Sequence, residues 1–157
     1  MHSTEEGPWT SLGNSIAAGS APTVITSDGR FPQEDIYVVG GGAGGPLYAA
    51  SLNVGTGQLS AWTSLGNIGA NATPSVVSRM PYDGSPYEDI YVRGAGGSVY
   101  WKWFNVNTGQ QGPWVYLNGG TNAGAQPTVT TFMGRFPGED IYQVNSDGTL
   151  SCECNSW

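Results

Sequence analysis

The side chains in this sequence that could do chemistry are mainly aromatic rings and guanidinium groups. A flat aromatic face packs against the C–H side of a sugar ring, and a few fixed donors and acceptors meet the hydroxyls in a shallow preformed pocket. An arginine can also form forked hydrogen bonds to vicinal hydroxyls. The candidate carbohydrate-binding residues are therefore Trp62, Trp101, Trp103, Trp114, Tyr100, Arg30, Arg93 and Arg135.

The tryptophans also have a structural alternative, because aromatic rings can pack one sheet against the next. Trp9, Trp62 and Trp114 mark the same place in each of three sequence repeats, and we favour the packing role for them. Trp101 and Trp103 break the repeat pattern, so packing and binding both stay open for these two.

Catalytic groups are scarce, and the sequence predicts a protein that is not an enzyme. The single histidine is at position 2, and no Gly-x-Ser-x-Gly, His-Glu-x-x-His or Gly-x-x-x-x-Gly-Lys motif is present. The carboxylates occur as adjacent pairs at strand entrances, where the two side chains leave opposite faces and cannot act on one bond. We expect a scaffold role for these pairs, such as capping backbone amides of the preceding turn: Glu34-Asp35, Glu88-Asp89 and Glu139-Asp140.

Composition indicates an all-β chain rich in turns. Of 157 residues, 25 are Gly and 10 are Pro, and only 11% are charged, which leaves few stretches for a long amphipathic helix. The net charge of −7 offers no basic stripe, so nucleic acid is not expected as a partner. No apolar run could span a bilayer and the first residues lack signal-peptide character, so we expect synthesis in the cytoplasm, release only by a non-classical route, and no membrane insertion.

Cysteine and histidine usage argues against a metal site and a cofactor. Cys152 and Cys154 are two residues apart, so on a strand both side chains point to one face and a bridge between them is strained. Two reduced thiols that serve as small packing residues are favoured over a disulfide or a metal site. With one histidine near the start, no Cys/His cluster can form within the chain.

The sequence repeats itself with a period of just over fifty residues. The clearest landmark is the tetrapeptide Glu-Asp-Ile-Tyr, which ends at Tyr37, Tyr91 and Tyr142. Other landmarks keep the same order in each repeat: Trp-x-x-Leu, a Pro followed by a β-branched pattern, and, in two repeats, Asn-Val-x-Thr-Gly-Gln. Arg30 and Arg135 occupy the same Gly-Arg-Phe-Pro turn of repeats one and three, which the middle repeat lacks.

Each repeat has the strand pattern of one four-stranded antiparallel blade of a β-propeller. In the middle repeat the predicted strands are 73–79, 88–94, 98–105 and 112–117. In the third of these, Val99, Trp101 and Trp103 share one face. The corresponding positions in the other repeats are small or aliphatic: Leu47, Ala49 and Ser51, and Leu150, Cys152 and Cys154.

Three blades are too few to close a propeller, so we expect the ring to close by oligomerisation. The predicted organisation is a flexible tail at 1–8 followed by three blades at 9–157, with repeats at about 9–61, 62–113 and 114–157. The last blade lacks a fourth strand, and Trp9 to Gly13 of another copy would complete it. A homodimer with six blades is the simplest arrangement, ahead of a nine-bladed trimer or a fragment of a longer propeller.

The order of motifs resembles the repeat of the PLL-like propeller lectins and, more distantly, that of fucose-binding propeller lectins. It is clearest in Trp62 to Gly66, Thr73 to Val76, Asp89 to Gly94 and Gly97 to Phe104. The resemblance implies a multivalent lectin that binds fucose or related, sometimes O-methylated, sugars of glycoproteins or cell surfaces. The Arg, Glu and Trp arrangement of the fucose lectins does not map clearly onto this sequence, and Arg93 has no counterpart at Val39 or Gln143.

Two alternatives remain open beside the lectin hypothesis. A protein-binding propeller would present an exposed aromatic patch, such as Trp101 and Trp103, to a peptide. A structural or engineered scaffold would also account for the clean repeats and the scarcity of catalytic groups.

Overall fold

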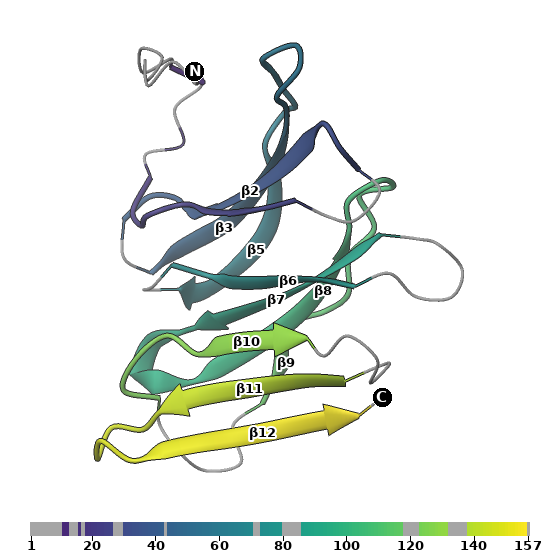
Figure 1. The fold of residues 1–157 in the computed structure, drawn as a ribbon. Coiled ribbons are helices and arrows are strands. Elements are labelled where there is room, and N and C mark those ends of the chain that lie inside the picture. Colours follow the sequence, from purple (N-terminus) through teal and green to yellow (C-terminus); the bar gives the residue numbers. More distant parts are fainter. Residues whose placement is uncertain are drawn as a thin grey trace, which may run out of the picture.

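The structure is a computed structural model that describes residues 11–12, 16, 18–26, 30–42, 44–70, 73–79, 86–117, 123–131 and 138–156. These residues form antiparallel sheets, which confirms the predicted all-β class (Figure 1). The predicted tail at 1–8, the strand expected to start at Trp9, and Arg135 lie outside the described residues.

The first sheet contains β1 (Thr23–Ile25), β2 (Gln33–Val39), β3 (Gly45–Asn53), β4 (Gln58–Leu59) and β5 (Thr63–Ala70). The strands run in the order β1-β2-β3-β4, and β5 also pairs with β3. The turn between β2 and β3 contains Gly41 and Gly42 at φ of 72° and 90°, a backbone conformation that residues with a Cβ rarely adopt. The glycine-rich segment therefore allows the tight β2–β3 connection.

The second sheet contains β6 (Ser75–Arg79), β7 (Tyr87–Arg93), β8 (Val99–Asn105) and β9 (Val115–Tyr116), in that order. A single 3-10 turn, η1 (Ala95–Gly97), connects β7 to β8. Each of the four strands predicted for the middle repeat overlaps one of these strands.

The third sheet contains β10 (Thr128–Thr131), β11 (Gly138–Val144) and β12 (Leu150–Ser156). Within the part of the chain that the structure describes, no fourth strand pairs with β12.

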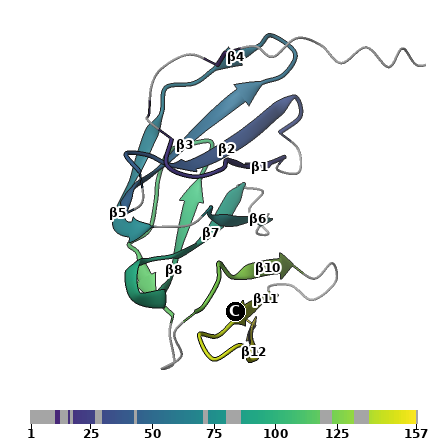
Figure 2. The ribbon, with the colours of Figure 1, turned by 90° about the vertical axis from the view of Figure 1, so that its left-hand side faces the viewer.

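The three sheets follow one another along the chain, as Figure 1 and Figure 2 show. Their first strands, β1, β6 and β10, lie side by side. Thr23 donates its hydroxyl hydrogen to the Pro74 carbonyl, and Ser75 donates in the same way to the Pro127 carbonyl. One sheet is thus joined to the next by the same bond at the same place in the repeat.

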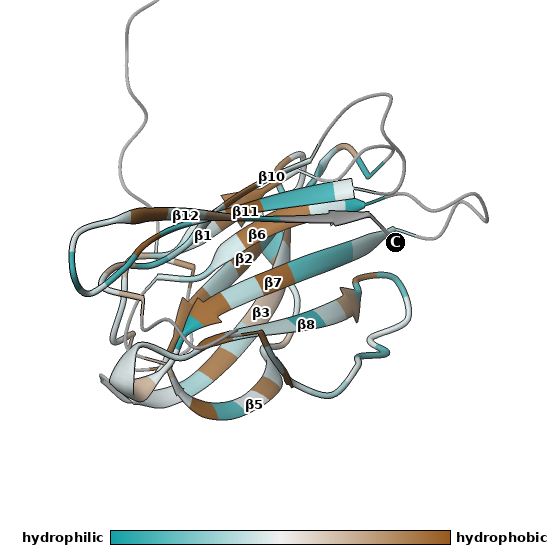
Figure 3. Ribbon diagram, turned by 90° about the horizontal axis from the view of Figure 1, so that it is seen from below, coloured by the Kyte–Doolittle hydropathy of each residue, from teal (hydrophilic) through white to brown (hydrophobic). Residues whose placement is uncertain are grey.

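The hydrophobic core lies between the first and second sheets. Figure 3 shows hydrophobic residues interspersed with polar ones along β5 and β7. The core residues come from β2, β3, β5, β7 and β8: Tyr37, Val39, Leu47, Ala49, Leu65, Ala70, Ile90, Val92 and Phe104. No helix among the described residues is long and apolar enough to cross a membrane.

Candidate functional site

A cavity of about 300 Å³ opens between the first and second sheets, in the space that we call the first gap. Asp35, Tyr37 and Ala49 are buried at its inner end, whereas Ser60 and Gly109 are exposed at its mouth. The complete lining joins small apolar side chains to a carboxylate and several hydroxyls: Asp35, Tyr37, Ala49, Ala50, Ser51, Ser60, Ala61, Thr63, Phe104, Val106 and Gly109. The volume is at the lower end for small-molecule pockets, which hold about 300–1,000 Å³.

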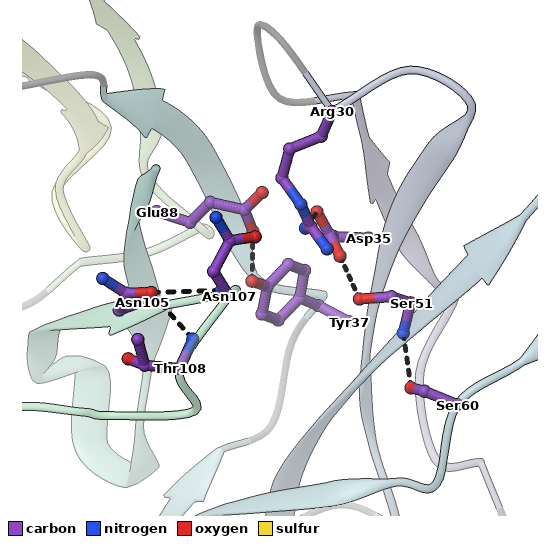
Figure 4. Close-up of polar contacts among 9 residues, drawn as sticks. All are labelled: Arg30, Asp35, Tyr37, Ser51, Ser60, Glu88, Asn105, Asn107 and Thr108. Carbon is purple, nitrogen blue, oxygen red and sulfur yellow. Dashed lines mark hydrogen bonds and ion pairs between the residues drawn. The ribbon is translucent and has the colours of Figure 1, made fainter. Parts of the chain in front are cut away.

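Asp35 is the charged group of this cavity, and two neighbours fix its orientation (Figure 4). It forms an ion pair with Arg30, and the Ser51 hydroxyl donates to its other carboxylate oxygen. Asp35 and Ser51 face each other across β2 and β3, so their side chains share one face of the sheet. The sequence predicted that Asp35 caps backbone amides, whereas in the structure side chains make these bonds and hold its carboxylate at a cavity wall.

Tyr37 and Glu88 connect the two sheets beside Asp35 (Figure 4). The Tyr37 hydroxyl donates to Glu88, and both side chains are fully buried. Burial, and next the negative charge of Glu88, raise the pKa of Tyr37 well above its ordinary value. Tyr37 therefore stays protonated as a hydrogen-bond donor and does not serve as a base.

The mouth of the cavity is shaped by a turn that the repeated Asn-Val-x-Thr-Gly-Gln motif builds. The Asn105 side-chain oxygen accepts from the backbone N–H groups of Asn107 and Thr108 at 3.1 and 3.0 Å. Asn53 does the same in the first sheet, with Gly55 and Thr56 at 3.0 Å. The motif is thus an Asx-type turn, which places Val106 and Gly109 against the cavity.

The second gap, between the second and third sheets, shares the tyrosine–glutamate hydrogen bond of the first gap but has larger side chains beside it. Tyr91 donates to Glu139 there, as Tyr37 donates to Glu88 in the first gap. By strand register Trp101 replaces Ala49 and Trp103 replaces Ser51. The Trp101 indole N–H donates to Asp89 Oδ1 at 2.9 Å, and Trp103 packs edge-on against Tyr87 with ring centroids 5.5 Å apart.

Two carboxyl groups meet in the second gap. Asp89 forms an ion pair with Arg79, whose Nε lies 2.8 Å from Asp89 Oδ2, and it is also hydrogen-bonded to Glu139. Burial, and next the charge of Asp89, raise the pKa of Glu139 to about 8. Burial also raises the pKa of Asp89, while Glu139, Arg79 and Trp101 oppose that rise. At neutral pH Glu139 therefore holds a proton that it donates to Asp89.

The structure brings the predicted tryptophans to several different places. Trp101 and Trp103 lie in the second gap, as described above. The Trp114 indole N–H donates to the Leu65 carbonyl at 2.9 Å, which ties the second sheet to the first. Trp62 is half-buried, and within the described residues its indole nitrogen is buried without a hydrogen-bond partner.

The other predicted residues also lie apart from one another. Tyr100 packs against Tyr116 with ring centroids 5.7 Å apart. The Arg93 Nε donates to the Ala123 carbonyl at 2.6 Å, which joins β7 to the segment that leads into the third sheet. Of the eight predicted binding residues, Arg30 forms an ion pair with Asp35 of the cavity lining, and Arg135 lies outside the described residues.

The cavity residues Asp35, Ala49 and Ser51 were not predicted as site residues. The available signal was the difference among repeats, because Ala49 and Ser51 are small where the middle repeat has two tryptophans. Each Glu-Asp pair stands alone in the sequence, so the sequence does not indicate that Glu139 of one repeat meets Asp89 of the preceding one.

In the described ranges, no three His, Cys, Asp or Glu side chains come together as a set that could hold a metal ion. Cys152 is exposed on β12.

The chain matches no known protein-family model and no curated protein sequence. Its structure is similar to that of a fucose lectin from Kordia zhangzhouensis, solved in complex with methyl-fucoside. The TM-score is 0.56 at 14% sequence identity, and the match covers 87% of this chain and 92% of that chain. At this identity the likeness shows a shared fold with a carbohydrate-binding protein of similar chain length.

Proposed function

We propose that this protein is a non-catalytic lectin that binds one sugar unit in the first-gap cavity. The observation that carries the proposal is the preformed cavity of about 300 Å³, with an oriented carboxylate at its inner end and exposed residues at its mouth. The fold shared with a fucose lectin supports the same class of function.

The lining suits a deoxy or methylated sugar such as fucose or an O-methylated relative. Asp35 can accept hydrogen bonds from two vicinal hydroxyls, because Arg30 and Ser51 already hold its carboxylate in place. Ser60 and Thr63 add hydroxyls that donate or accept. Ala49, Ala61 and Phe104 offer apolar surface for a methyl group and for the C–H face of the ring.

The assembly that fits this function is a six-bladed ring of two chains related to the PLL-like propeller lectins. Each antiparallel sheet corresponds to one blade, and a second copy supplies what the third sheet lacks. Several weak sites on one ring, each with a Kd of about millimolar to micromolar, gain avidity on a dense glycan surface. Glycans of glycoproteins or cell surfaces are the partners we propose, reached after release by a non-classical route.

A glycan array followed by calorimetric titration with methyl-fucoside tests the sugar proposal. The decisive variant is Ala49→Trp, which places in the first gap the residue that fills the second. We expect about 100-fold weaker binding or none, because the indole occupies the cavity. The matched control is Ala95→Trp on the exposed η1 turn, which should bind as the unmodified protein does.

Circular dichroism and thermal melting show whether both variants remain folded. An unmodified protein that holds no glycan on the array would overturn the proposal. Equal binding by a folded Ala49→Trp variant would move the sugar site away from the first gap.

A further inference from the structure

The first-gap cavity has room for one sugar unit, so a further unit of a glycan would lie outside its mouth. Its volume of about 300 Å³ is at the lower end for small-molecule pockets. The inner end of the cavity is buried, and the exposed residues of its lining are Ser60, Ala61 and Gly109. A glycan whose terminal unit occupies the cavity therefore extends into solvent past these three residues.

One side of this mouth is the turn at residues 105–110, and several hydrogen bonds fix its backbone. The Asn105 N–H donates to the Gln110 carbonyl at 2.8 Å, and the Gly109 N–H donates to the Asn105 carbonyl at 2.8 Å. These bonds add to the two that the Asn105 side chain accepts within the turn. The turn is therefore ordered before a ligand binds, which lowers the entropic cost of binding.

The turn carries polar groups that can serve a ligand. Asn107 and Thr108 are exposed, and among the described residues the Asn107 side-chain amide forms no hydrogen bond. The Thr108 hydroxyl oxygen accepts from the Gln110 N–H at 3.3 Å, and its hydrogen is available to donate. In Figure 4 the Asn107 side chain points from the turn toward the first gap, on the side of Tyr37.

The same turn in the first sheet is built without this amide. Asn53 accepts the corresponding side-chain hydrogen bonds there, from the N–H groups of Gly55 and Thr56 at 3.0 Å. In the repeated motif Gly55 stands at the position of Asn107. Because a glycine suffices for the turn, the backbone does not require Asn107, and its amide is available for another role.

The two segments that border the mouth carry no charged side chain. Residues 58–61 are Gln-Leu-Ser-Ala, and residues 106–111 are Val-Asn-Thr-Gly-Gln-Gln. Amides and hydroxyls form directional hydrogen bonds with neutral hydroxyl groups. An acidic sugar would find no cation on these segments and would be repelled by the net charge of −7.

We propose that the turn at residues 105–110 is a second subsite, at which Asn107 and Thr108 bind the second unit of a neutral oligosaccharide whose terminal sugar fills the cavity. The Asn107 amide both donates and accepts, which suits vicinal hydroxyls, and the Thr108 hydroxyl donates one further hydrogen bond. This inference rests on the proposed function and specifies its ligand as a neutral glycan of two or more units.

Calorimetric titration with two ligands separates the subsite from the cavity. Methyl-fucoside fills the cavity alone, whereas a disaccharide with terminal fucose linked to galactose reaches both places. We expect the disaccharide to bind about 10-fold more tightly, because the turn adds two or three hydrogen bonds to neutral groups. A disaccharide with galacturonic acid in place of galactose should lose most of this advantage, and tighter binding of the acidic ligand would overturn the neutral class.

Asn107→Gly is the decisive variant, since it introduces the residue that builds the same turn in the first sheet. It should keep the affinity for methyl-fucoside and reduce the advantage of the disaccharide to about two-fold or three-fold. Asn107→Ala removes the same amide without adding backbone freedom and should behave alike. Asn67→Gly, the same exchange at an exposed position of β5 outside the cavity lining, is the matched control and should change neither affinity.

The outcomes distinguish the subsite from the lectin function itself. If the unmodified protein binds methyl-fucoside and gains nothing from the disaccharide, the subsite is refuted and the cavity stands. Equal weakening of both ligands by a folded Asn107→Gly variant would also refute the subsite, because Asn107 would then act on the first sugar unit. Binding of neither ligand by the unmodified protein would refute the lectin function and the subsite together.

Discussion

The first and second gaps share the same polar contacts between sheets and differ in the side chains that occupy the space beside these contacts. In both gaps a tyrosine of one sheet donates to a buried glutamate of the next, and an arginine pairs with an aspartate. The first gap keeps a cavity beside these contacts because Ala49 and Ser51 are small. The second gap has Trp101 and Trp103 at the same register positions. Two positions on one strand therefore decide between a potential binding site and a packed interface.

The charges in the two gaps differ as well. Asp35 has Arg30 and Ser51 as neighbours and is positioned as an acceptor at a cavity wall. Asp89 receives the Trp101 N–H and a proton-bearing Glu139, so its acceptor capacity is used within the protein. In the first gap Asp35 can still accept hydrogen bonds from a ligand. In the second gap Asp89 accepts from protein side chains, and these bonds stabilise the contact between the two sheets.

The largest expected effect comes from emptying the second gap. Trp101→Ala removes a large ring between two sheets and the hydrogen bond to Asp89. We expect the free energy of unfolding to fall by about 2–3 kcal/mol, less than for fully buried aromatic truncations, because Trp101 is half-buried. Urea denaturation measures the loss, and sugar binding by the folded protein should be unchanged. A variant that keeps its stability but loses sugar binding would reverse the roles of the two gaps.

Much of the fold could be predicted from the sequence because each repeat carries its own strand and turn signals. The Glu-Asp-Ile-Tyr tetrapeptides lie within β2, β7 and β11, and alternation on 99–105 predicted the face that Trp101 and Trp103 share. The repeat does not indicate which sheet the shared face of Trp101 and Trp103 contacts, because this contact involves residues about fifty positions away in sequence.

The site was harder to predict because large aromatic residues are the usual sequence sign of a sugar site. In the first gap the useful feature is their absence, since Ala49 and Ser51 leave the space. The sequence left two roles open for Arg30, a forked contact to sugar hydroxyls and an ion pair with a neighbouring glutamate. In the structure Arg30 forms an ion pair with Asp35. Arg79 was not predicted at all, since the middle repeat lacks the Gly-Arg-Phe-Pro turn and supplies its guanidinium from β6 instead.

Neutralising one aspartate in each gap sharpens the comparison with a smaller effect. Asp35→Asn keeps the shape of the side chain but removes a charged acceptor from the cavity, so methyl-fucoside binding should weaken by about 10-fold, or about 1.4 kcal/mol. Asp89→Asn makes the same change in the second gap and should leave the affinity unchanged. Both variants should lose some stability, because Arg30 or Arg79 is left without its carboxylate.

Calorimetric titration of the two variants measures both affinities under the same conditions. Equal weakening by Asp89→Asn and Asp35→Asn would mean that the aspartates act on the fold and that the first gap has no special role.

The smallest expected effect is a pH dependence that belongs to the second gap alone. The pKa of Glu139 is raised to about 8 in the folded chain, above the value of about 4.3 for an unfolded glutamate. Between these values the folded state holds a proton that the unfolded state has released, so stability falls as pH rises and levels off above pH 8. This group should make the unmodified protein about 1 kcal/mol less stable at pH 8 than at pH 7.

Glu139→Gln tests that pH dependence, because an amide can donate to Asp89 and accept from Tyr91 without titrating. The variant should be about as stable as the unmodified protein at pH 6 and should lose less stability between pH 7 and pH 8. Glu153→Gln, at an exposed position of β12, is the matched control and should keep the original slope in urea denaturation. If Glu139→Gln follows the same slope as the control, Glu139 carries no proton at neutral pH, and the second gap holds two charged carboxylates beside Arg79.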